Sequence, residues 1–139
     1  MTRTTTDPTP APLTDAVARY LRFWNAPPGQ QEQLGADVFA DDVTSVTPVG
    51  IRTGVGELAA FARHFREEAG AYELRARTEP DTHHDRARLR WELVVGGASF
   101  AEGTDVLVVD ASGRIASVTA FLDRAPEGFD ARAHAEEAS

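Results

Sequence analysis

The stretch GTDVLVVDASGRIASVTAFLD, residues 103–123, decides the fold that we expect for this chain. It holds two runs rich in β-branched and apolar residues, Thr104–Val109 and Ile115–Leu122, joined by the segment DASGR. Two such runs joined by a short segment of Asp, Ser and Gly predict an antiparallel hairpin. We therefore predict that this stretch forms part of the main β-sheet.

Alternation with a period of two extends upstream of this hairpin. The runs Tyr72–Thr78 and Ala87–Val95 alternate apolar and charged side chains, which is typical of strands with one buried face. The segments PDTHHD and GGASFAEG between the runs contain turn-forming residues, and we predict them as turns. A further strand, Val43–Thr47, is predicted from its β-branched composition. Four of the five strands thus follow one another in hairpin succession.

Helical spacing appears only in the first half of the chain. Residues 14–25 carry apolar side chains on one face after Thr14, a plausible N-cap, and shorter helical patterns follow in GQQEQLGADVF and GVGELAAFARHFREEAG. Helices followed by a run of strands predict an α+β domain. We expect a curved antiparallel sheet with helices packed on its concave face, forming a cone with an internal pocket.

The composition limits the compartment and the partners. The chain has 139 residues, a net charge of −8 and no cysteine, and its 14 basic residues are all arginines. An acidic chain without a basic run is a poor candidate for binding nucleic acid or anionic membranes. It contains neither a membrane-spanning apolar run nor the apolar segment of a signal peptide. We expect a cytoplasmic protein with a disordered leader over 1–13, one domain over 14–123 and a solvated tail over 124–139.

Three motifs in order resemble the nuclear transport factor 2-like superfamily: ARYLRFWN (18–25), FADDVTSVTPVG with the following GIRTGVGELAAF (39–61), and GTDVLVVDASGRIASVTAFLD (103–123). This superfamily includes ketosteroid isomerase, scytalone dehydratase, limonene epoxide hydrolase and the SnoaL-type polyketide cyclases. The resemblance implies a small apolar ligand, no cofactor and a homodimer. Such a fold hosts unrelated activities, so function depends on the site.

Within the superfamily, the pattern is most similar to that of ketosteroid isomerase, which serves as a worked case in general accounts of pKa tuning. The resemblance implies that Tyr20 and a protonated Asp105 donate hydrogen bonds to an enolate oxygen. The catalytic base would occupy the position before Pro48, where this chain has Thr47. A threonine hydroxyl cannot act as a general base unaided. The alternative for Tyr20 and Asp105 is a purely structural role in the core.

The candidates for the missing base are the histidines, because they titrate near neutral pH, or a group on the substrate itself. His64 lies on the third helix between two phenylalanines, and His83 and His84 lie in a turn before a strand. Neighbouring strand residues point to opposite faces, so His83, His84 and Asp85 predict no metal site. We expect the following residues to contact the substrate: Trp24, Thr47, Phe61, His84 and Trp91.

The sequence therefore predicts an enzyme of the SnoaL or ketosteroid-isomerase type. Its substrate would be an apolar oxygenated molecule resembling a polyketide, steroid or terpenoid. The reaction would be isomerisation, cyclisation or dehydration through an enolate or another oxyanion. The alternative is a dimeric module that binds a small ligand without catalysis, and the loss of the base at Thr47 favours it. A protein-interaction module is a third hypothesis.

Overall fold

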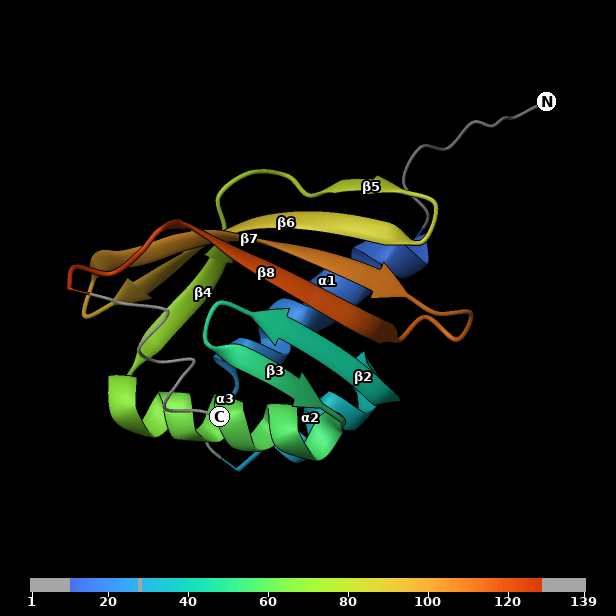
Figure 1. Cartoon of the computed structure of the whole chain (residues 1–139), viewed down its shortest axis with the longest axis horizontal. Helices are drawn as coiled ribbons and strands as arrows, with labels where there is room; N and C mark the ends of the chain where they lie inside the picture. Colours follow the sequence, from blue (N-terminus) through green and yellow to red (C-terminus); the bar gives the residue numbers. More distant parts are fainter. Residues whose placement is uncertain (1–10, 28, 129–139) are drawn as a thin grey trace.

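The structure is a computed structural model that describes residues 11–27 and 29–128, with side chains from residue 13 onward (Figure 1). The first helix begins at Ala11, three residues before the expected start, and Leu13 packs into the core. The expected leader therefore overlaps the helix. Residues 1–10, and most of the tail expected over 124–139, lie outside the described residues.

Three helices and seven strands make up the described chain. The helices are α1 (Ala11–Asn25), α2 (Gln31–Val38) and α3 (Val55–Ala69). The strands are β2 (Phe39–Thr47), β3 (Gly50–Thr53), β4 (Tyr72–Ala76), β5 (Asp81–His83), β6 (Arg86–Val95), β7 (Ala98–Val109) and β8 (Ile115–Arg124).

All strands belong to one sheet with the order β3-β2-β8-β7-β6-β4, and β5 pairs with β6 outside this path. The fold class expected from the sequence is confirmed, with one correction. The pair β2 and β8 is parallel, whereas every other pair is antiparallel. Alternation of side chains indicates which face of a strand is buried, but not the direction of its neighbour. The sheet is therefore mixed.

Two segments expected to be turns contain strand residues. Only Gly96 and Gly97 form the turn between β6 and β7, and both have positive φ angles, of 60° and 81°. A two-residue turn with positive φ at both positions suits the twist of a hairpin, and glycine adopts it without strain. The strand β7 can therefore begin at Ala98, six residues earlier than expected. The segment PDTHHD contains the short strand β5.

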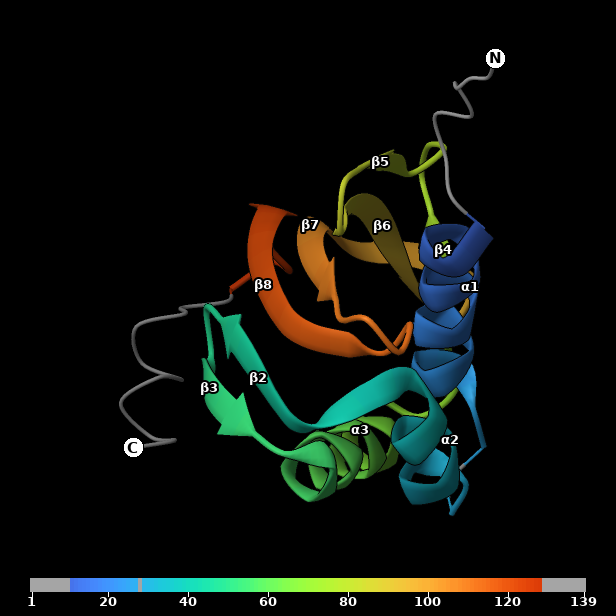
Figure 2. The same cartoon turned by 90° about the vertical axis from the view of Figure 1, so that its right-hand side faces the viewer.

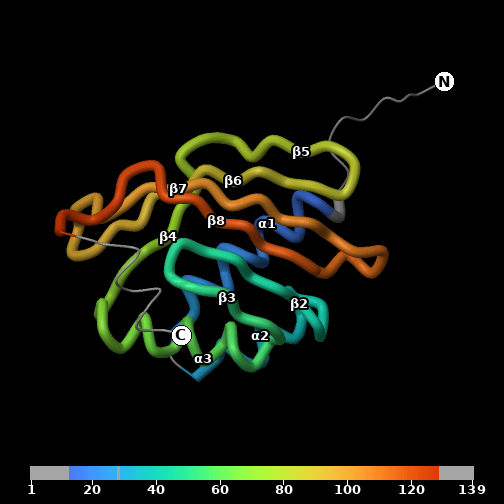
Figure 3. The backbone as a smooth tube through the Cα atoms, in the orientation of Figure 1, coloured from blue at the N-terminus to red at the C-terminus, as the bar shows by residue number. Residues whose placement is uncertain are grey.

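The helices pack on the concave side of the strongly curved sheet, as Figure 2 shows. The tube in Figure 3 shows α3 joining the edge strand β3 to the opposite edge strand β4, so this helix crosses the open side of the curve. The apolar core lies between these layers, where Phe23 and Phe39 meet at 5.0 Å between ring centroids. Aromatic edge-to-face contacts of this kind stabilise the helix–sheet interface.

Candidate active site

An open cavity of about 840 Å³ lies between the concave face of the sheet and helices α1 and α3. Most of its wall is apolar or aromatic, and a few polar groups interrupt it. The residues that line the cavity include Tyr20, Trp24, Ser45, Thr47, Arg52, Phe61, His64, Trp91, Asp105, Val118 and Ala120. An apolar cavity with a few converging polar groups is the usual form of a small-molecule site.

Asp105 is the most deeply buried carboxylate on the cavity wall, with 5% of its surface exposed. It lies in the middle of β7, between Leu89 of β6 and Ala120 of β8 in the strand register. The Tyr20 hydroxyl donates a hydrogen bond of 2.5 Å to its Oδ2 atom. The Trp91 indole N–H donates one of 2.8 Å to its Oδ1 atom. Each carboxylate oxygen thus accepts one hydrogen bond.

Gly103 makes the contact between Trp91 and Asp105 possible. Trp91 and Gly103 are direct partners across β6 and β7. A Cβ atom at Gly103 would lie only 2.2 Å from Cζ2 of the Trp91 indole. The absence of a side chain therefore lets the indole lie over β7 and reach Asp105, two residues further along the same face.

Tyr20 reaches Asp105 from α1 and is held by aromatic neighbours. Its ring meets Phe39 at 6.1 Å and Trp24 at 6.3 Å between centroids, both in edge-to-face geometry. The phenol is 2% exposed. One turn of helix separates Tyr20 from Trp24, which places both side chains on the face that looks into the sheet.

Burial determines the protonation behaviour of this pair. Burial raises the pKa of Asp105 to about 6, although the hydrogen bonds from Tyr20 and Trp91 lower it. Burial also raises the pKa of Tyr20 well above its usual range, and the charge of Asp105 raises it further. Near neutral pH the site therefore contains a neutral phenol and a largely ionised carboxylate. In this state Asp105 accepts hydrogen bonds, whereas the sequence predicted a protonated donor.

The other expected site residues differ in position. Trp24, Phe61 and Trp91 all line the cavity. The buried Trp24 indole N–H makes no hydrogen bond of good geometry to another described residue, but its interaction with Tyr20 offsets part of the pKa rise that burial causes in that phenol. His64 lies at the cavity mouth, where 66% of its side chain is exposed and its Nε2 atom is 3.1 Å from Oε2 of Glu68. The structure therefore does not bring His64 to the buried pair of Tyr20 and Asp105.

Thr47 lines the cavity, but its hydroxyl group is used by the turn between β2 and β3. It donates to the carbonyl of Gly50 at 3.2 Å and accepts from the Val49 N–H at 3.2 Å. These bonds close the hairpin in the way that threonine side chains often do. Thr47 thus contributes to the shape of the cavity wall and carries no titratable group.

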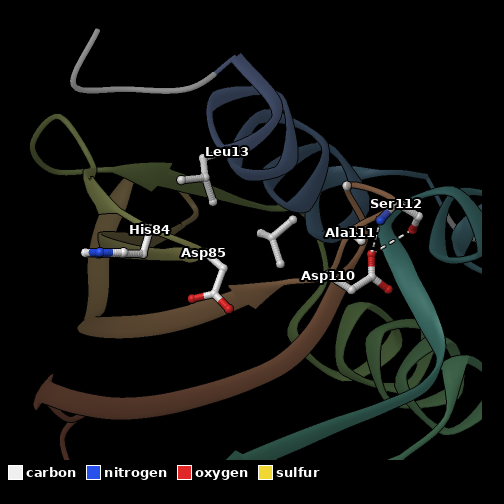
Figure 4. Close-up of a pocket in the computed structure, with 8 residues that line it drawn as sticks. Leu13, His84, Asp85, Asp110, Ala111 and Ser112 are labelled. Atoms are coloured by element: carbon white, nitrogen blue, oxygen red, sulfur yellow. Dashed lines mark hydrogen bonds between the residues drawn. The ribbon is translucent and has the colours of Figure 1, made fainter. Parts of the chain in front are cut away.

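His84 does not line this cavity, which corrects the position expected from the sequence. It is an exposed residue with a φ angle of 53° in the turn between β5 and β6. It lies beside a separate pocket near the start of α1, together with Asp85 and Asp110 (Figure 4). Its ring points away from Leu13 and Asp110 in that view. His84 lies in the turn that precedes β6, whereas the cavity residues of that strand lie in its second half, at Trp91 and Leu93.

Arg52 is a cavity residue that sequence reasoning missed. It lies on β3 opposite Ser45 of β2, and both side chains line the cavity. Its Cζ atom is 3.8 Å from the centroid of the Phe61 ring. Alternation within the short run GIRT could have suggested an inward Arg52, but four residues do not define a face. Among the described residues, no group of three or more metal-ligating side chains is placed to hold a metal ion.

Comparisons with solved structures identify the fold. The chain is 28% identical to a protein from Agrobacterium tumefaciens, provisionally described as an isomerase of the SnoaL-like family, with a TM-score of 0.76 over 81% of this chain and 97% of that one. A SnoaL-like polyketide cyclase from Jannaschia sp., also a provisional description, matches with 14% identity, a TM-score of 0.70, and coverage of 86% and 92%. A similarly described polyketide cyclase from Sinorhizobium meliloti has 19% identity, a TM-score of 0.64, and coverage of 77% and 94%.

These likenesses fit a SnoaL-type protein at the level of fold and general class. No family profile and no curated protein matches the sequence. In the described part of the chain, no helix is both long enough and apolar enough to cross a membrane.

Proposed function

Because this chain shares the fold of SnoaL-like proteins and its cavity surrounds a buried carboxylate, we propose that it is a SnoaL-type acid–base enzyme. Its substrate is a small, apolar, oxygenated molecule of the polyketide, steroid or terpenoid kind. Asp105 is the base that removes a proton from the substrate. In this proposal Asp105 takes the role of the base that the resemblance placed at the position of Thr47.

The hydrogen-bonded environment of Asp105 is the observation that carries this proposal. A carboxylate with a pKa of about 6 is largely ionised at neutral pH, yet it is a stronger base than an exposed aspartate. Tyr20 and Trp91 bind one oxygen each and fix the plane of the carboxylate. A fixed base in a largely apolar cavity needs little reorganisation when the proton moves.

The proposed reaction begins at a C–H bond next to a carbonyl group. Asp105 takes the proton, the C–H electrons form the enolate double bond, and negative charge collects on the carbonyl oxygen. Asp105 then returns the proton to a different carbon, which gives isomerisation. Alternatively, the enolate attacks a second carbonyl carbon and Asp105 protonates the resulting alkoxide, which gives cyclisation. In a third case the enolate expels a β-hydroxyl group, which takes the proton from Asp105 and leaves as water, and this gives dehydration.

Tyr20 and Trp24 supply the hydrogen bonds for the developing negative charge. Once Asp105 is protonated, it can donate to the Tyr20 oxygen, and the Tyr20 hydroxyl is then free to donate to the substrate. The indole N–H of Trp24 lies on the same helical face, close enough to the Tyr20 hydroxyl to offset part of the pKa rise that burial causes there, and can donate to the same oxygen. Donors directed at a developing oxyanion commonly contribute a few kcal/mol to transition-state stabilisation.

A base-catalysed elimination tests the proposal without knowledge of the natural substrate. Nitrobenzisoxazole loses its ring proton to a base while its N–O bond breaks, and it forms a coloured cyanonitrophenolate. We expect the wild-type protein to catalyse this reaction at a rate that rises with pH through an apparent pKa near 6. Asp105→Asn should lower the rate at least about 100-fold.

The matched control is Asp123→Asn, which removes an exposed carboxylate on β8 outside the cavity lining. This variant should keep the wild-type rate. A rate that survives Asp105→Asn would mean that another group is the base. A wild-type protein that binds the probe without converting it would favour the alternative function, a small-ligand-binding module, which the use of the Thr47 hydroxyl in a turn also favours.

A further inference from the structure

Arg52 is a cation on the cavity wall that forms no ion pair or hydrogen bond among the described residues, and Glu57 acts on it only at longer range. Its side chain is half-buried, and its Nη1 atom is buried without a hydrogen bond. No carboxylate of the described residues lies within ion-pair distance of its guanidinium. Instead, the guanidinium makes a cation–π contact with the face of the Phe61 ring, whose centroid is 3.8 Å from Cζ of Arg52. Within the described part of the chain, the guanidinium of Arg52 therefore lacks a hydrogen-bond acceptor at Nη1.

The position of Arg52 in the sheet directs it into the cavity. Arg52 pairs with Ser45, and Ser45 pairs with Val118 of β8, so these three residues form one row across the sheet. All three line the cavity. The neighbouring β3 residue, Ile51, points to the opposite face and is 69% exposed. The alternation of β3 thus separates an inward cation from an outward apolar side chain.

An unpaired cation next to apolar side chains is energetically unfavourable. A half-buried guanidinium loses part of its hydration, and buried polar groups are normally compensated by hydrogen bonds. Burial lowers the pKa of Arg52, and the more distant Glu57 raises it, but an arginine stays charged in either case. The Phe61 face offers only a partial replacement for the lost water. A ligand with an acceptor oxygen would supply the missing hydrogen bond.

We propose that Arg52 binds an anionic oxygen of the ligand, so that the cavity takes an apolar, ring-containing acid. The oxygen belongs to a carboxylate or an acidic enolate, because the planar guanidinium binds such groups through two parallel hydrogen bonds. This inference rests on the proposed function, since it names the substrate class of the same cavity. The neutral end of the same ligand would face Asp105.

The geometry of the sheet supports this orientation. Three strand spacings separate β3 from β7 in the order β3-β2-β8-β7, which is about 14 Å between backbones. The row of Arg52 is adjacent to that of Asp105, because Val118 pairs with Leu107, two residues from Asp105. A ligand of two or three fused rings can bridge the remaining gap. The negative charge of Asp105 repels the anionic end of the ligand and favours its binding at Arg52.

A pair of probes that differ only in charge tests the inference. Naphthoate and naphthamide have the same ring system, and only naphthoate is ionised at pH 8. We expect the wild-type protein to bind naphthoate at least about tenfold more tightly, which corresponds to one charge-assisted hydrogen-bonded contact. Isothermal titration calorimetry gives both dissociation constants. This comparison uses the wild-type protein and does not depend on the folding of a variant.

Three variants assign the preference to Arg52. Arg52→Gln should remove it, Arg52→Lys should retain part of it, and the control Arg63→Gln, on an exposed position of α3, should leave it unchanged. Equal binding of the two probes by the wild type, or a preference that survives Arg52→Gln, would overturn the inference. If Arg52 only protects the edge of the sheet, Arg52→Gln should aggregate, and the wild-type protein should bind naphthoate and naphthamide equally.

Asp105→Asn separates this inference from the proposed function. We expect this variant to lose the elimination activity but to keep its preference for naphthoate. Loss of the preference in Asp105→Asn would overturn the independent role of Arg52. A wild type that prefers naphthoate and lacks elimination activity would contradict the proposed function and leave Arg52 as the anion site of a binding protein.

Discussion

The carboxyl group of Asp105 lies where ionisation is costly. Leu89 and Ala120 flank it in the sheet, and the side chain is 5% exposed. The two hydrogen bonds that it accepts offset only part of the lost hydration, because its pKa remains raised to about 6. The protein therefore tolerates an unfavourable charge at the centre of its cavity, as expected for a group retained for chemistry.

Asp105→Asn should make the protein more stable at neutral pH. The folded state binds the Asp105 proton more tightly than the unfolded chain does, so this group destabilises the fold as the pH rises from about 4 to about 6. The asparagine keeps a hydrogen bond to both Trp91 and Tyr20, since its amide can donate to the phenol oxygen. We expect a gain of up to about 3 kcal/mol in the free energy of unfolding above pH 6.

Urea unfolding at several pH values measures this effect. The gain should shrink as the pH falls from about 6 to about 4 and vanish below about pH 3, where Asp105 is protonated in both states. Asp123→Asn is the control with opposite sign, because hydrogen bonds from Thr104 and Arg77 lower the pKa of Asp123 and stabilise its ionised form. A gain for Asp105→Asn that does not depend on pH would mean that Asp105 does not titrate in this range.

Sequence reasoning found the residues of the buried pair but not their arrangement. Tyr20 and Asp105 were recognised through motifs, and both lie on the cavity wall. The acceptor role of Asp105 could not be predicted, because it depends on Trp91 reaching across Gly103. Arg52 was missed because the direction of its side chain follows from pairing with Ser45, and that register is set by the turn that Thr47 closes.

Among the elements, β7 can place Asp105 beside the Trp91 indole because Gly103 has no side chain. The strand runs along the middle of the sheet and carries Asp105 toward the cavity. At Gly103 the backbone carbonyl of Phe121 would be 2.6 Å from an added Cβ atom, and the Trp91 ring would be closer still. The backbone carbonyl cannot rotate away, so the indole would have to move.

Gly103→Ala should therefore disturb both stability and the Asp105 site. We expect a loss of about 1–3 kcal/mol in the free energy of unfolding, typical of overpacking. Displacement of Trp91 should also change the near-ultraviolet circular dichroism of the indole. Gly56→Ala on α3 is the matched control, because a Cβ there has nothing within 4 Å. In a helix this control should be stabilising by about 0.5–1 kcal/mol, and equal effects of the two substitutions would contradict our account.

The boundaries of the elements were harder to predict than their order. The periodicity of the second half of the chain gave the hairpin succession from β4 to β8. The length of β7 was underestimated, because Gly96 and Gly97 complete the turn in two residues and release Ala98–Gly103 to the strand. The parallel pairing of β2 with β8 joins segments far apart in sequence, and no local signal encodes it.

On the scale of the whole molecule, the outer face of the sheet has an apolar area near one edge. Val46 and Ile51 are direct partners on β2 and β3, and they are 41% and 69% exposed. Thr119 and Val106 continue the same row across β8 and β7. Further along the sheet, Arg88 of β6 opens the charged part of this face. Exposed apolar side chains gathered on a sheet face favour contact with another protein surface.

We expect this face to pair with a second copy of the chain, as the resemblance to the superfamily implies. Ile51→Asp should then convert a dimer into a monomer, because each copy would bury a carboxylate in an apolar contact. Analytical ultracentrifugation measures the mass directly. Arg63→Glu on α3, away from the sheet face, should leave the mass unchanged. A wild-type protein that is monomeric at high concentration would contradict this expectation.

The pairing of β2 with β8 also has a consequence for how the protein folds. The hairpins from β6 to β8 connect neighbouring segments, and such contacts form with little loss of chain entropy. The pairing of Ser45 with Val118 closes a longer loop than any pairing within these hairpins, so β2 with β8 is entropically the most expensive strand pairing of the sheet. We expect the hairpin that carries Arg52 to dock late. The cavity wall around Asp105 would then form before the wall that carries Arg52. A partly folded chain would lack the anion-binding part of the cavity.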